Sequence, residues 1–494
     1  MNSAVIPNHE AVVIGAGFSG IGAAIKLGEA GVSDYLVIEE GDGVGGAWHW
    51  NTYPGIGVDI PSFSYQFSFE KRSDWSHVYA SGRELKAYAE QCVDKYGVRP
   101  RLRLNTRVTE ARFDEDEHLW RLSLDAGEEI TTRFVITAQG ALSQPQLPDI
   151  EGLDDFEGVK MHSARWDHSR SVAGKRVAVI GTGCSGVQIV PTIAPVVEHL
   201  TVFQRTPIWC LPKPDRELGA RERWLLRHVP GAKLATRWLS QVFVELNFPL
   251  AAHYYGVVPL AHRGEAVGRA FLRKQVKDPE VRKKLTPKYG LGCKRPGFSN
   301  DYLPTFNRDN VYLETSPIER ITPAGVRTLD GTEHEVDVLV LATGFKVFES
   351  TVPVYGVGGV ELTEWWEANR IQAYEGVSVP DFPNFFHIIG PYGFNGASFF
   401  LLIETQMRHI TRLLKRARGS RATRVEVRPE ANERYWRSML ARRHNQIFFR
   451  DTCSLANSYY FDEHGDVPFR ASASVETIWR ANRFDLDDYR FEAA

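Results

Sequence analysis

Two glycine-rich loops carry the strongest chemical signal in this chain of 494 residues. The first is Gly15-Ala16-Gly17-Phe18-Ser19-Gly20, and the second is Gly181-Thr182-Gly183-Cys184-Ser185-Gly186. In this spacing the first glycine permits a tight turn, the second lets the backbone approach a pyrophosphate, and the third allows a helix to pack closely on a strand. Each loop therefore predicts a binding site for a dinucleotide.

The residues at the end of the next strand distinguish the two sites. After the first loop that strand ends on Glu39, whose carboxylate can accept hydrogen bonds from ribose hydroxyls; Glu40 is the neighbouring alternative but points the other way. After the second loop the strand runs into Gln204-Arg205-Thr206, without an acid. A 2′-phosphate is repelled by a carboxylate and bound by a guanidinium, so Arg205 and Thr206 favour NADPH over NADH at the second site.

The elements around the loops have the pattern of a nucleotide-binding fold. Continuous apolar strands, 11–14 and 176–180, lead into the two loops, and helical spacing follows each loop. A second buried strand comes next in each half, at 35–38 and 200–203. Strand, loop, helix and strand in this order, twice over, predict an α/β chain with two doubly wound dinucleotide-binding domains.

Two segments predict how these domains are connected. The proline-spaced stretch from Pro145 to Pro148 and the apolar strand from Asp337 to Leu341 look like the crossings into and out of an inserted second domain. We therefore expect residues 1–145 to form the first part of the first domain, 146–336 the inserted domain, and 337–494 the second part of the first domain with a C-terminal lid. Residues from about 209 to 288 lack strand alternation and are rich in Leu, Arg, Trp and Ala, which predicts a helical insertion.

Three longer patterns accompany the loops. The first, G-G-x-W-x-W-x-x-Y-P-G-x-x-x-D, runs from Gly45 to Asp59; its small residues Gly46 and Ala47 let backbone approach a flat cofactor, and Trp48 supplies a rigid apolar wall. The second, F-x-G-x-x-x-H-S-x-x-W-D, spans 156–167 between the two loops. The third, K-R followed by Y-x-x-x-F-N-R-x-N-V, spans 294–311.

Taken together, the loops and patterns resemble the type I Baeyer–Villiger monooxygenases over nearly the whole chain. The resemblance implies FAD in the first domain and NADPH in the second. It also implies insertion of oxygen from O2 next to the carbonyl of a small-molecule ketone, through a C4a-peroxyflavin, to give an ester or lactone. The string at 156–167 is then expected on the connector between the domains, where His162 and Trp166 would affect domain motion; core packing of Trp166 is the alternative.

The same resemblance assigns roles to individual residues. Arg295 is implied to be catalytic and Asp59 to pair with it, because a guanidinium that stays protonated can stabilise a peroxide and a negatively charged adduct. Further cofactor contacts are implied for Lys294 at the 2′-phosphate, Gln188 beside the second loop, Tyr65 near the flavin and Val108 near the adenine. The chain departs from the family pattern at His49, at Gly57 and at Tyr459 in the lid, so the shape of the substrate pocket is left open.

Two other functions compete with this interpretation. An N- or S-oxidising flavin monooxygenase would share both loops, although the Trp166-Asp167 ending favours the Baeyer–Villiger group. A redox sensor that binds both nucleotides without oxygenating a substrate is a more distant alternative. The presence of Arg295, Asp59 and both loops argues against a sensor.

Composition restricts the partners and the location. A formal net charge of -2 indicates no nucleic-acid partner, and the most apolar stretch, 238–261, is interrupted by polar residues, so no transmembrane segment is expected. The first ten residues lack the features of an export signal. The five cysteines form no C-x-x-C or C-x-x-x-x-C pair, so they indicate neither a disulfide framework nor a metal site. This pattern favours a cytoplasmic location. It also counts against a disulfide reductase, which needs a redox-active dithiol.

Overall fold

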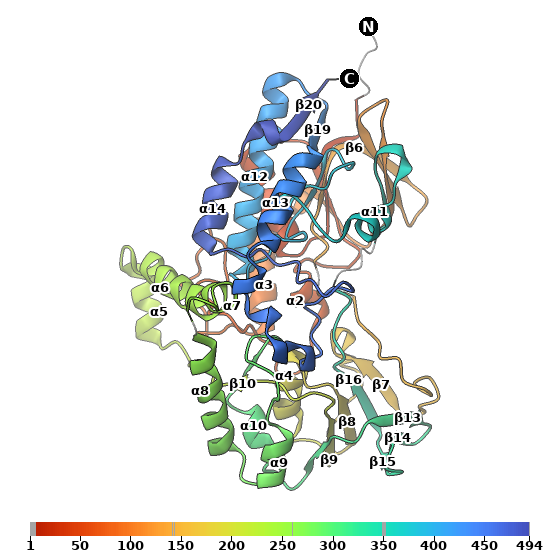
Figure 1. Cartoon of the computed structure of the whole chain (residues 1–494), viewed down its shortest axis with the longest axis vertical. Helices are drawn as coiled ribbons and strands as arrows, with labels where there is room; N and C mark the ends of the chain where they lie inside the picture. The colour runs from red at the N-terminus through yellow and green to blue at the C-terminus, as the bar shows by residue number, and fades with distance from the viewer. Residues whose placement is uncertain (1–5, 141, 143, 259, 348–351, 494) are drawn as a thin grey trace.

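The computed structural model describes residues 6–140, 142, 144–258, 260–347 and 352–493. The chain folds around two large β-sheets, one in the upper and one in the lower part of Figure 1, and the part of the helical insertion from Ala220 to Asn247 projects to the left between them. This arrangement agrees with the predicted α/β class with two doubly wound units.

The first sheet contains the first glycine loop. Its strands run in the order β17 (Val354–Tyr355), β4 (Val108–Asp114), β5 (Leu119–Leu124), β6 (Glu129–Thr137), β1 (His9–Ile14), β2 (Tyr35–Ile38) and β3 (Leu102–Arg103), with β18 (Phe385–His387) on β6. β1 is central and parallel to both neighbours, so Val13 lies between Val37 and Ile136. The loop therefore begins at the carboxyl end of a strand whose last four residues are buried, where ligands bind in this kind of sheet.

The second sheet contains the second loop and is entirely parallel. Its order is β12 (Val311–Glu314), β9 (His199–Phe203), β8 (Arg176–Ile180), β16 (Val338–Leu341) and β7 (Val159–His162). Between β12 and β16 the chain forms a small antiparallel sheet of β13 (Ile318–Thr322), β14 (Gly325–Thr328) and β15 (Glu333–Glu335).

One predicted boundary differs from the structure. The sequence analysis assigned residues 337–494 to the first domain, but β16 pairs with β8 and β7 in the second sheet, where Val340 is in register with Val179 and Met161. An all-apolar strand is buried in the same way in either sheet, so its composition does not say which one it joins. The chain crosses back after β16: the Gln146 N–H donates to the Gly344 carbonyl at 2.9 Å, so the two crossings lie side by side.

Helices cover both sheets and form the insertion. The predicted helical stretch contains α5 (Ala220–His228), α6 (Ala232–Asn247), α7 (Pro249–His253), α8 (Leu260–Gln275) and α9 (Pro279–Lys284), preceded by β10 (Cys210–Leu211), which pairs with β11 (Gly297–Phe298). The other helices are α1 (Phe18–Glu29), α2 (Ala47–Trp50), α3 (Gly82–Lys95), α4 (Cys184–Ile193), α10 (Tyr302–Thr305), α11 (Leu362–Asn369), α12 (Phe399–Ser420), α13 (Pro429–Leu440) and α14 (Ser474–Arg483). Strands β19 (Arg424–Val427) and β20 (Tyr489–Glu492) form a two-stranded sheet near the C-terminus. Within the described ranges, no helix is both long and apolar enough to cross a bilayer.

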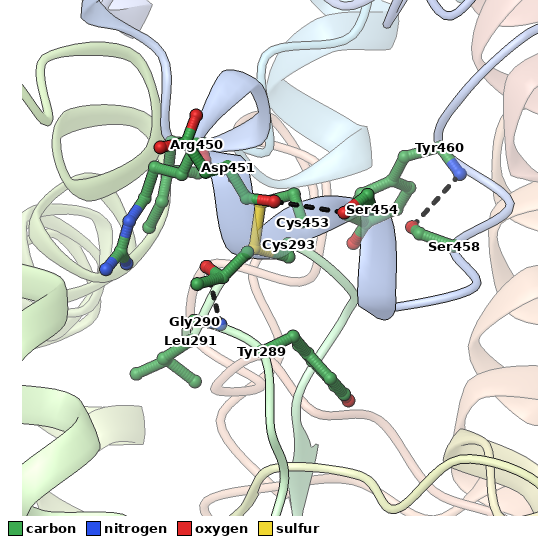
Figure 2. Close-up of a disulfide and its surroundings, with 12 residues drawn as sticks. Tyr289, Gly290, Leu291, Cys293, Arg450, Asp451, Cys453, Ser454, Ser458 and Tyr460 are labelled. Atoms are coloured by element: carbon green, nitrogen blue, oxygen red, sulfur yellow. Dashed lines mark hydrogen bonds between the residues drawn. A yellow bond between two sulfur atoms is a disulfide. The ribbon is translucent and has the colours of Figure 1, made fainter.

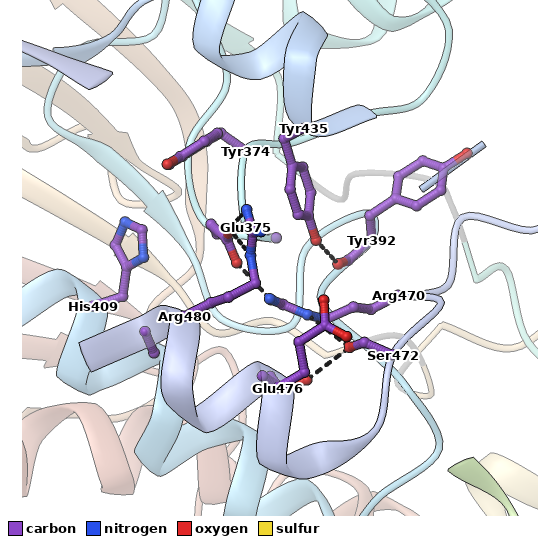
Figure 3. A network of polar contacts seen from close by, with 12 residues as sticks. Tyr374, Glu375, Tyr392, His409, Tyr435, Arg470, Ser472, Glu476 and Arg480 are labelled. Carbon is purple, nitrogen blue, oxygen red and sulfur yellow. Dashed lines mark hydrogen bonds and ion pairs between the residues drawn. The ribbon is translucent and has the colours of Figure 1, made fainter. Parts of the chain in front are cut away.

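A buried ion cluster fastens the C-terminal region to the first domain (Figure 3). The Glu375 carboxylate is 2 % exposed; it accepts hydrogen bonds from Arg470 Nη2 at 2.6 Å and from Arg480 Nε at 2.6 Å. Burial alone would raise the pKa of Glu375, but the two guanidinium groups reverse this effect and hold it below its ordinary value. The segment that precedes α14 and the first turns of that helix are therefore anchored in a low-dielectric site.

Replacing Glu375 with Gln should lower the free energy of unfolding by about 3–5 kcal/mol, because the buried Arg470 and the half-buried Arg480 both lose their counter-charge. Denaturant titration would measure this effect, with Glu333→Gln as the control, since Glu333 pairs with Arg327 at the surface and should contribute under about 1 kcal/mol. The folded-state pKa of Glu375 is lowered, so its contribution is present above the unfolded value of about 4.3 and is lost as the pH falls through the folded pKa. An equal loss for both variants would contradict the prediction.

Candidate active site

A single cavity of about 1380 Å³ is lined by both glycine loops. It exceeds the roughly 300–1000 Å³ of a pocket for one drug-sized ligand, so it can hold more than one extended ligand. Of the predicted site residues, those lining it are Gly15, Gly17, Phe18, Ser19, Glu39, Gly46, Ala47, Trp48, Asp59, Tyr65, Val108, Gly181, Thr182, Gly183, Cys184, Ser185, Gln188, Arg205, Thr206, Lys294 and Arg295. The exceptions are Gly20 and Gly186.

The first loop has the geometry of a pyrophosphate site. Gly15 has a φ of +102°, and a Cβ there would lie 2.7 Å from the Ala138 carbonyl oxygen. A Cβ on Gly20 would lie 1.8 Å from the carbonyl oxygen of Gly15, so Gly20 serves helix–strand packing rather than the cavity. Gly17 caps α1 without a side chain, which leaves first-turn N–H groups of the helix available to an anion.

Glu39 lies at the end of β2, on the wall of the cavity. Its buried carboxylate accepts hydrogen bonds from the N–H groups of Ala16, at 2.7 Å, and Gly41, at 2.9 Å. These bonds fix the loop to the strand end, and they place the carboxylate where the ribose of a nucleotide in this fold lies.

The second site combines an uncapped helix start with two cations. Gly183 precedes α4 without a side-chain cap, as Gly17 does at α1. Burial lowers the pKa of Lys294, and the Arg205 guanidinium nearby lowers it further, so two positive charges converge on one wall. Asn457 reaches the same wall: with its amide oxygen facing Arg205, it accepts a hydrogen bond from Nε at 2.7 Å. An anion such as a phosphate would relieve the repulsion between the two cations.

Arg295 and Asp59 form a bidentate ion pair, as the family resemblance implies. Arg295 Nε donates to Asp59 at 2.9 Å and Nη2 donates to both carboxylate oxygens at 2.8 and 2.6 Å, which leaves Nη1 outside the pair. Burial alone would lower the pKa of Arg295, but the Asp59 carboxylate offsets this and keeps the guanidinium protonated. The cavity therefore contains a fixed positive charge held by a planar fork.

Aromatic side chains form the wall near the first loop. Trp48, in the short helix α2, packs edge to face on Tyr65 with ring centroids 5.8 Å apart. Trp50 carries the guanidinium of Arg165 over its ring at 4.2 Å. Because Arg165 follows β7 in the second sheet, this stacking joins the two domains across the cavity.

The string at 156–167 does not lie on the connector, where we expected it. It contains β7, an edge strand of the second sheet, and its Trp166 is packed in the core of that domain. His162 is buried, and burial, followed by the charge of Arg165, lowers its pKa to about 4. The core-packing alternative for Trp166 is correct. Strand β7 pairs with the all-apolar strand β16, a contact distant in sequence.

One further contact was not predicted. The Tyr53 hydroxyl donates to Gln188 Oε1 at 3.0 Å, while Gln188 Nε2 donates to the Gly57 carbonyl at 2.9 Å. These bonds tie the segment around Asp59 to α4 of the second domain. Tyr53 belongs to the Y-P-G pattern, and Gln188 was a predicted cofactor contact. The sequence did not indicate that these two side chains bond to each other.

The cysteine prediction was wrong in one respect. Cys293 and Cys453 form a disulfide with a Cα–Cα distance of 5.0 Å and a sequence separation of 160 (Figure 2). We refer to residues 451–469 as the C-terminal segment. The disulfide joins this segment to the loop that leads into Lys294 and Arg295. A pair so distant in sequence has no local signature, and the cysteine pattern therefore no longer supports the predicted cytoplasmic location, which stays a prediction.

Comparisons with known proteins agree with this geometry. Residues 12–218 match the family model described as pyridine nucleotide-disulphide oxidoreductase. A Baeyer–Villiger monooxygenase of Streptomyces coelicolor is 36 % identical over 98 % of this chain and 93 % of its own length. A phenazine N-monooxygenase of Lysobacter antibioticus is 34 % identical over 86 % of each protein.

Among solved structures, the OTEMO complex with FAD and NADP superposes with a TM-score of 0.88. It is 29 % identical, and the match covers 98 % of this chain and 100 % of that one. Shared sequence along nearly the whole chain, the two glycine loops and the Arg295–Asp59 pair lead to one conclusion: the chain belongs to the type I Baeyer–Villiger monooxygenase family.

Proposed function

We propose that this chain is an FAD-dependent monooxygenase that uses NADPH and O2 to insert oxygen next to the carbonyl of a small ketone, giving an ester or lactone. One oxygen atom enters the product and the other leaves as water, while NADPH and a proton supply the two reducing equivalents. The observation that carries the proposal is the Arg295–Asp59 pair inside a cavity that both glycine loops line.

The first loop suits FAD. The uncapped start of α1 and the closeness of Gly15 to Ala138 leave backbone, and no side chain, where a pyrophosphate approaches, with Glu39 beside it for the ribose. Trp48 and Tyr65 form the apolar wall for the flat ring system. FAD held by these residues would supply the chemistry that activates O2 and delivers one oxygen atom to the substrate.

In this proposal, Arg295 acts on the charge that develops during the transfer. Asp59 holds the guanidinium through Nε and Nη2, so Nη1 can donate to the carbonyl oxygen of the ketone as that oxygen becomes negative. The fixed fork needs little reorganisation at that moment, because Asp59 already orients it. Asp59 is thus the positioning residue and Arg295 the catalytic one.

A panel of small ketones tests the proposal. Purified protein with NADPH in air should convert at least one ketone to an ester or lactone, with product formed in proportion to NADPH consumed. Hydrogen peroxide should be measured in parallel, because it reports reduced flavin that reacted with O2 without transferring oxygen. NADPH consumption with peroxide as the sole product across a broad panel would count against ketone oxygenation.

Oxidation of nitrogen or sulfur is the second candidate, and the 34 % identical phenazine N-monooxygenase favours including it in the test. Such a reaction needs no stabilised negative charge on a substrate carbonyl, so it should depend little on Arg295. Amines and sulfides should therefore be offered to the same preparations. N-oxide or sulfoxide formation without any ester would replace the first proposal by this one.

NADPH should be used strongly in preference to NADH, and Lys294→Ala should raise the KM for NADPH by roughly 10- to 100-fold, because a charge-assisted contact to the 2′-phosphate is lost. The KM for NADH, which lacks that phosphate, should change little. Lys283→Ala is the control, since that lysine is exposed on α9 of the same domain. Equal use of both cofactors by the native enzyme would contradict this assignment.

A further inference from the structure

The outer side of helices α5 and α6 exposes a large apolar surface, named here the α5–α6 face. It consists of Trp224, Leu225, Trp238, Leu239, Val242 and Leu246, each between 46 % and 72 % exposed. In Figure 1 these two helices project to the left of the body of the molecule. Exposed apolar residues are common singly, but six on two helices that contact each other, two of them tryptophans, mark an interaction surface.

The helical repeat shows that this exposure is a property of one side of α6. The buried side of the helix contains Arg237, Ser240 and Val244. At 3.6 residues per turn, Trp238, Val242 and Leu246 lie on the other side of the same helix. A helix that is apolar toward solvent while its opposite side is already packed lacks a partner for its outer side.

The charges around the face have one dominant sign. Arg221, Arg223 and Arg227 lie on α5, and Lys233 lies at the start of α6. The acidic neighbours are occupied: Glu222 is paired with Arg216 at 2.6 Å, and Glu245 accepts a hydrogen bond from the Ser474 N–H at 2.9 Å. The surface is therefore apolar with a cationic margin, although the whole chain carries a formal charge of -2.

We propose that the α5–α6 face binds the surface of an anionic lipid bilayer. Tryptophan and leucine on one side of a helix, with arginine and lysine beside them, are the composition of helices that lie in a membrane interface. A second copy of this chain is the competing occupant. A two-fold contact would place the same cations of both copies together, which disfavours it.

The inner side of α6 contacts a segment that forms part of the cavity wall. Arg237 donates to the Gln66 carbonyl at 2.7 Å, and the Ser240 hydroxyl donates to Ser64 Oγ at 2.8 Å. Tyr65, between these two positions, lines the cavity. A bilayer on the outer side of α6 would thus lie next to the cavity wall; the membrane proposal itself does not depend on the proposed reaction.

Vesicle flotation tests the proposal on the full FAD-loaded chain. Wild-type protein should float with vesicles of phosphatidylcholine and phosphatidylglycerol, much less with phosphatidylcholine alone, and less at high ionic strength. The double variant Trp238→Gln/Leu239→Gln should reduce partitioning by roughly tenfold or more. Leu329→Gln, at a residue 65 % exposed after β14, is the matched control and should float like wild type.

A second variant, Arg221→Gln/Arg223→Gln, separates charge from apolar contact and should abolish the preference for phosphatidylglycerol. Bound flavin and NADPH oxidation should be unchanged in all variants, because these residues lie outside the cavity. Absence of flotation, no preference for anionic vesicles, or native flotation of the Trp238→Gln/Leu239→Gln variant would each overturn the proposal. So would a dimer, measured by light scattering, that this double variant dissociates, since the face would then join two copies.

Discussion

Arg295→Ala should lower the rate of ester formation by roughly two to three orders of magnitude, the effect of removing one preorganised charge-stabilising donor. The developing negative charge would then face a cavity wall without its fixed cation, and Asp59 would remain as an unpaired carboxylate beside it. FAD retention should survive, because the flavin contacts proposed at the first loop do not involve Arg295. Stopped-flow reduction of the flavin by NADPH and ester yield should be measured on the same preparations.

Arg295→Lys is the informative companion to this variant. It keeps the positive charge but replaces the planar fork by a single ammonium on a flexible stem, so it cannot reproduce the bidentate contact with Asp59. We expect it to be poor in ester formation and normal in flavin reduction. Conversion of ketone to ester by Arg295→Ala at a near-native rate would show that the assignment of Arg295 is wrong.

Gly17→Val should yield protein with less than about one tenth of the native flavin content, because the side chain would occupy the space where the pyrophosphate approaches the backbone. The choice of glycine matters. A Cβ at Gly17 would meet the protein only at an ordinary contact distance, 3.4 Å from Gly46 Cα, so the added side chain begins without a clash. At Gly15 the φ of +102° and the contact with Ala138 would strain the fold, and loss of flavin there would be ambiguous.

Gly183→Val is the matched control in the second loop, where, apart from the chain immediately around Gly183, no atom of the described residues lies within 4 Å of the added Cβ. It should retain FAD and weaken NADPH binding, the reverse of the Gly17 variant. Flavin absorbance per chain and NADPH titration distinguish the two. Full flavin occupancy in Gly17→Val would mean that the first loop is not the FAD site.

The features predicted correctly from the sequence are those specified by neighbouring residues. The loop at Gly15 needs a left-handed first residue and space for helix packing at Gly20, and these demands are met within six consecutive positions. The buried strands before each loop follow from their continuous apolar composition. The Arg295–Asp59 pair was expected from family resemblance, since nothing local links positions so far apart.

The features that sequence reasoning missed depend on contacts between distant segments. Strand β16 has the composition of any buried parallel strand, and its pairing with β7 and β8 is decided by where the chain crosses. The helical character of the insertion was predictable, but the exposure of Trp238 and Leu239 was not. Apolar residues at helical spacing predict a buried side, and only the packing of the opposite side, through Arg237 and Ser240, reveals that they face outward.

The disulfide has a consequence for the motion of the C-terminal segment. Cys293 lies two positions before Arg295, and Cys453 lies four positions before Asn457, which contacts Arg205. The path from Arg295 through the disulfide to Asn457 contains two residue steps, the Cα–Cα distance of 5.0 Å between the cysteines, and four more residue steps. Because an extended chain spans at most about 3.6 Å per residue, the Cα atoms of Arg295 and Asn457 can be at most roughly 27 Å apart. In the oxidised protein, the C-terminal segment therefore stays tethered close to Arg295. In the reduced protein, only the intervening 160 positions of chain connect Cys293 to Cys453, so this short tether is lost.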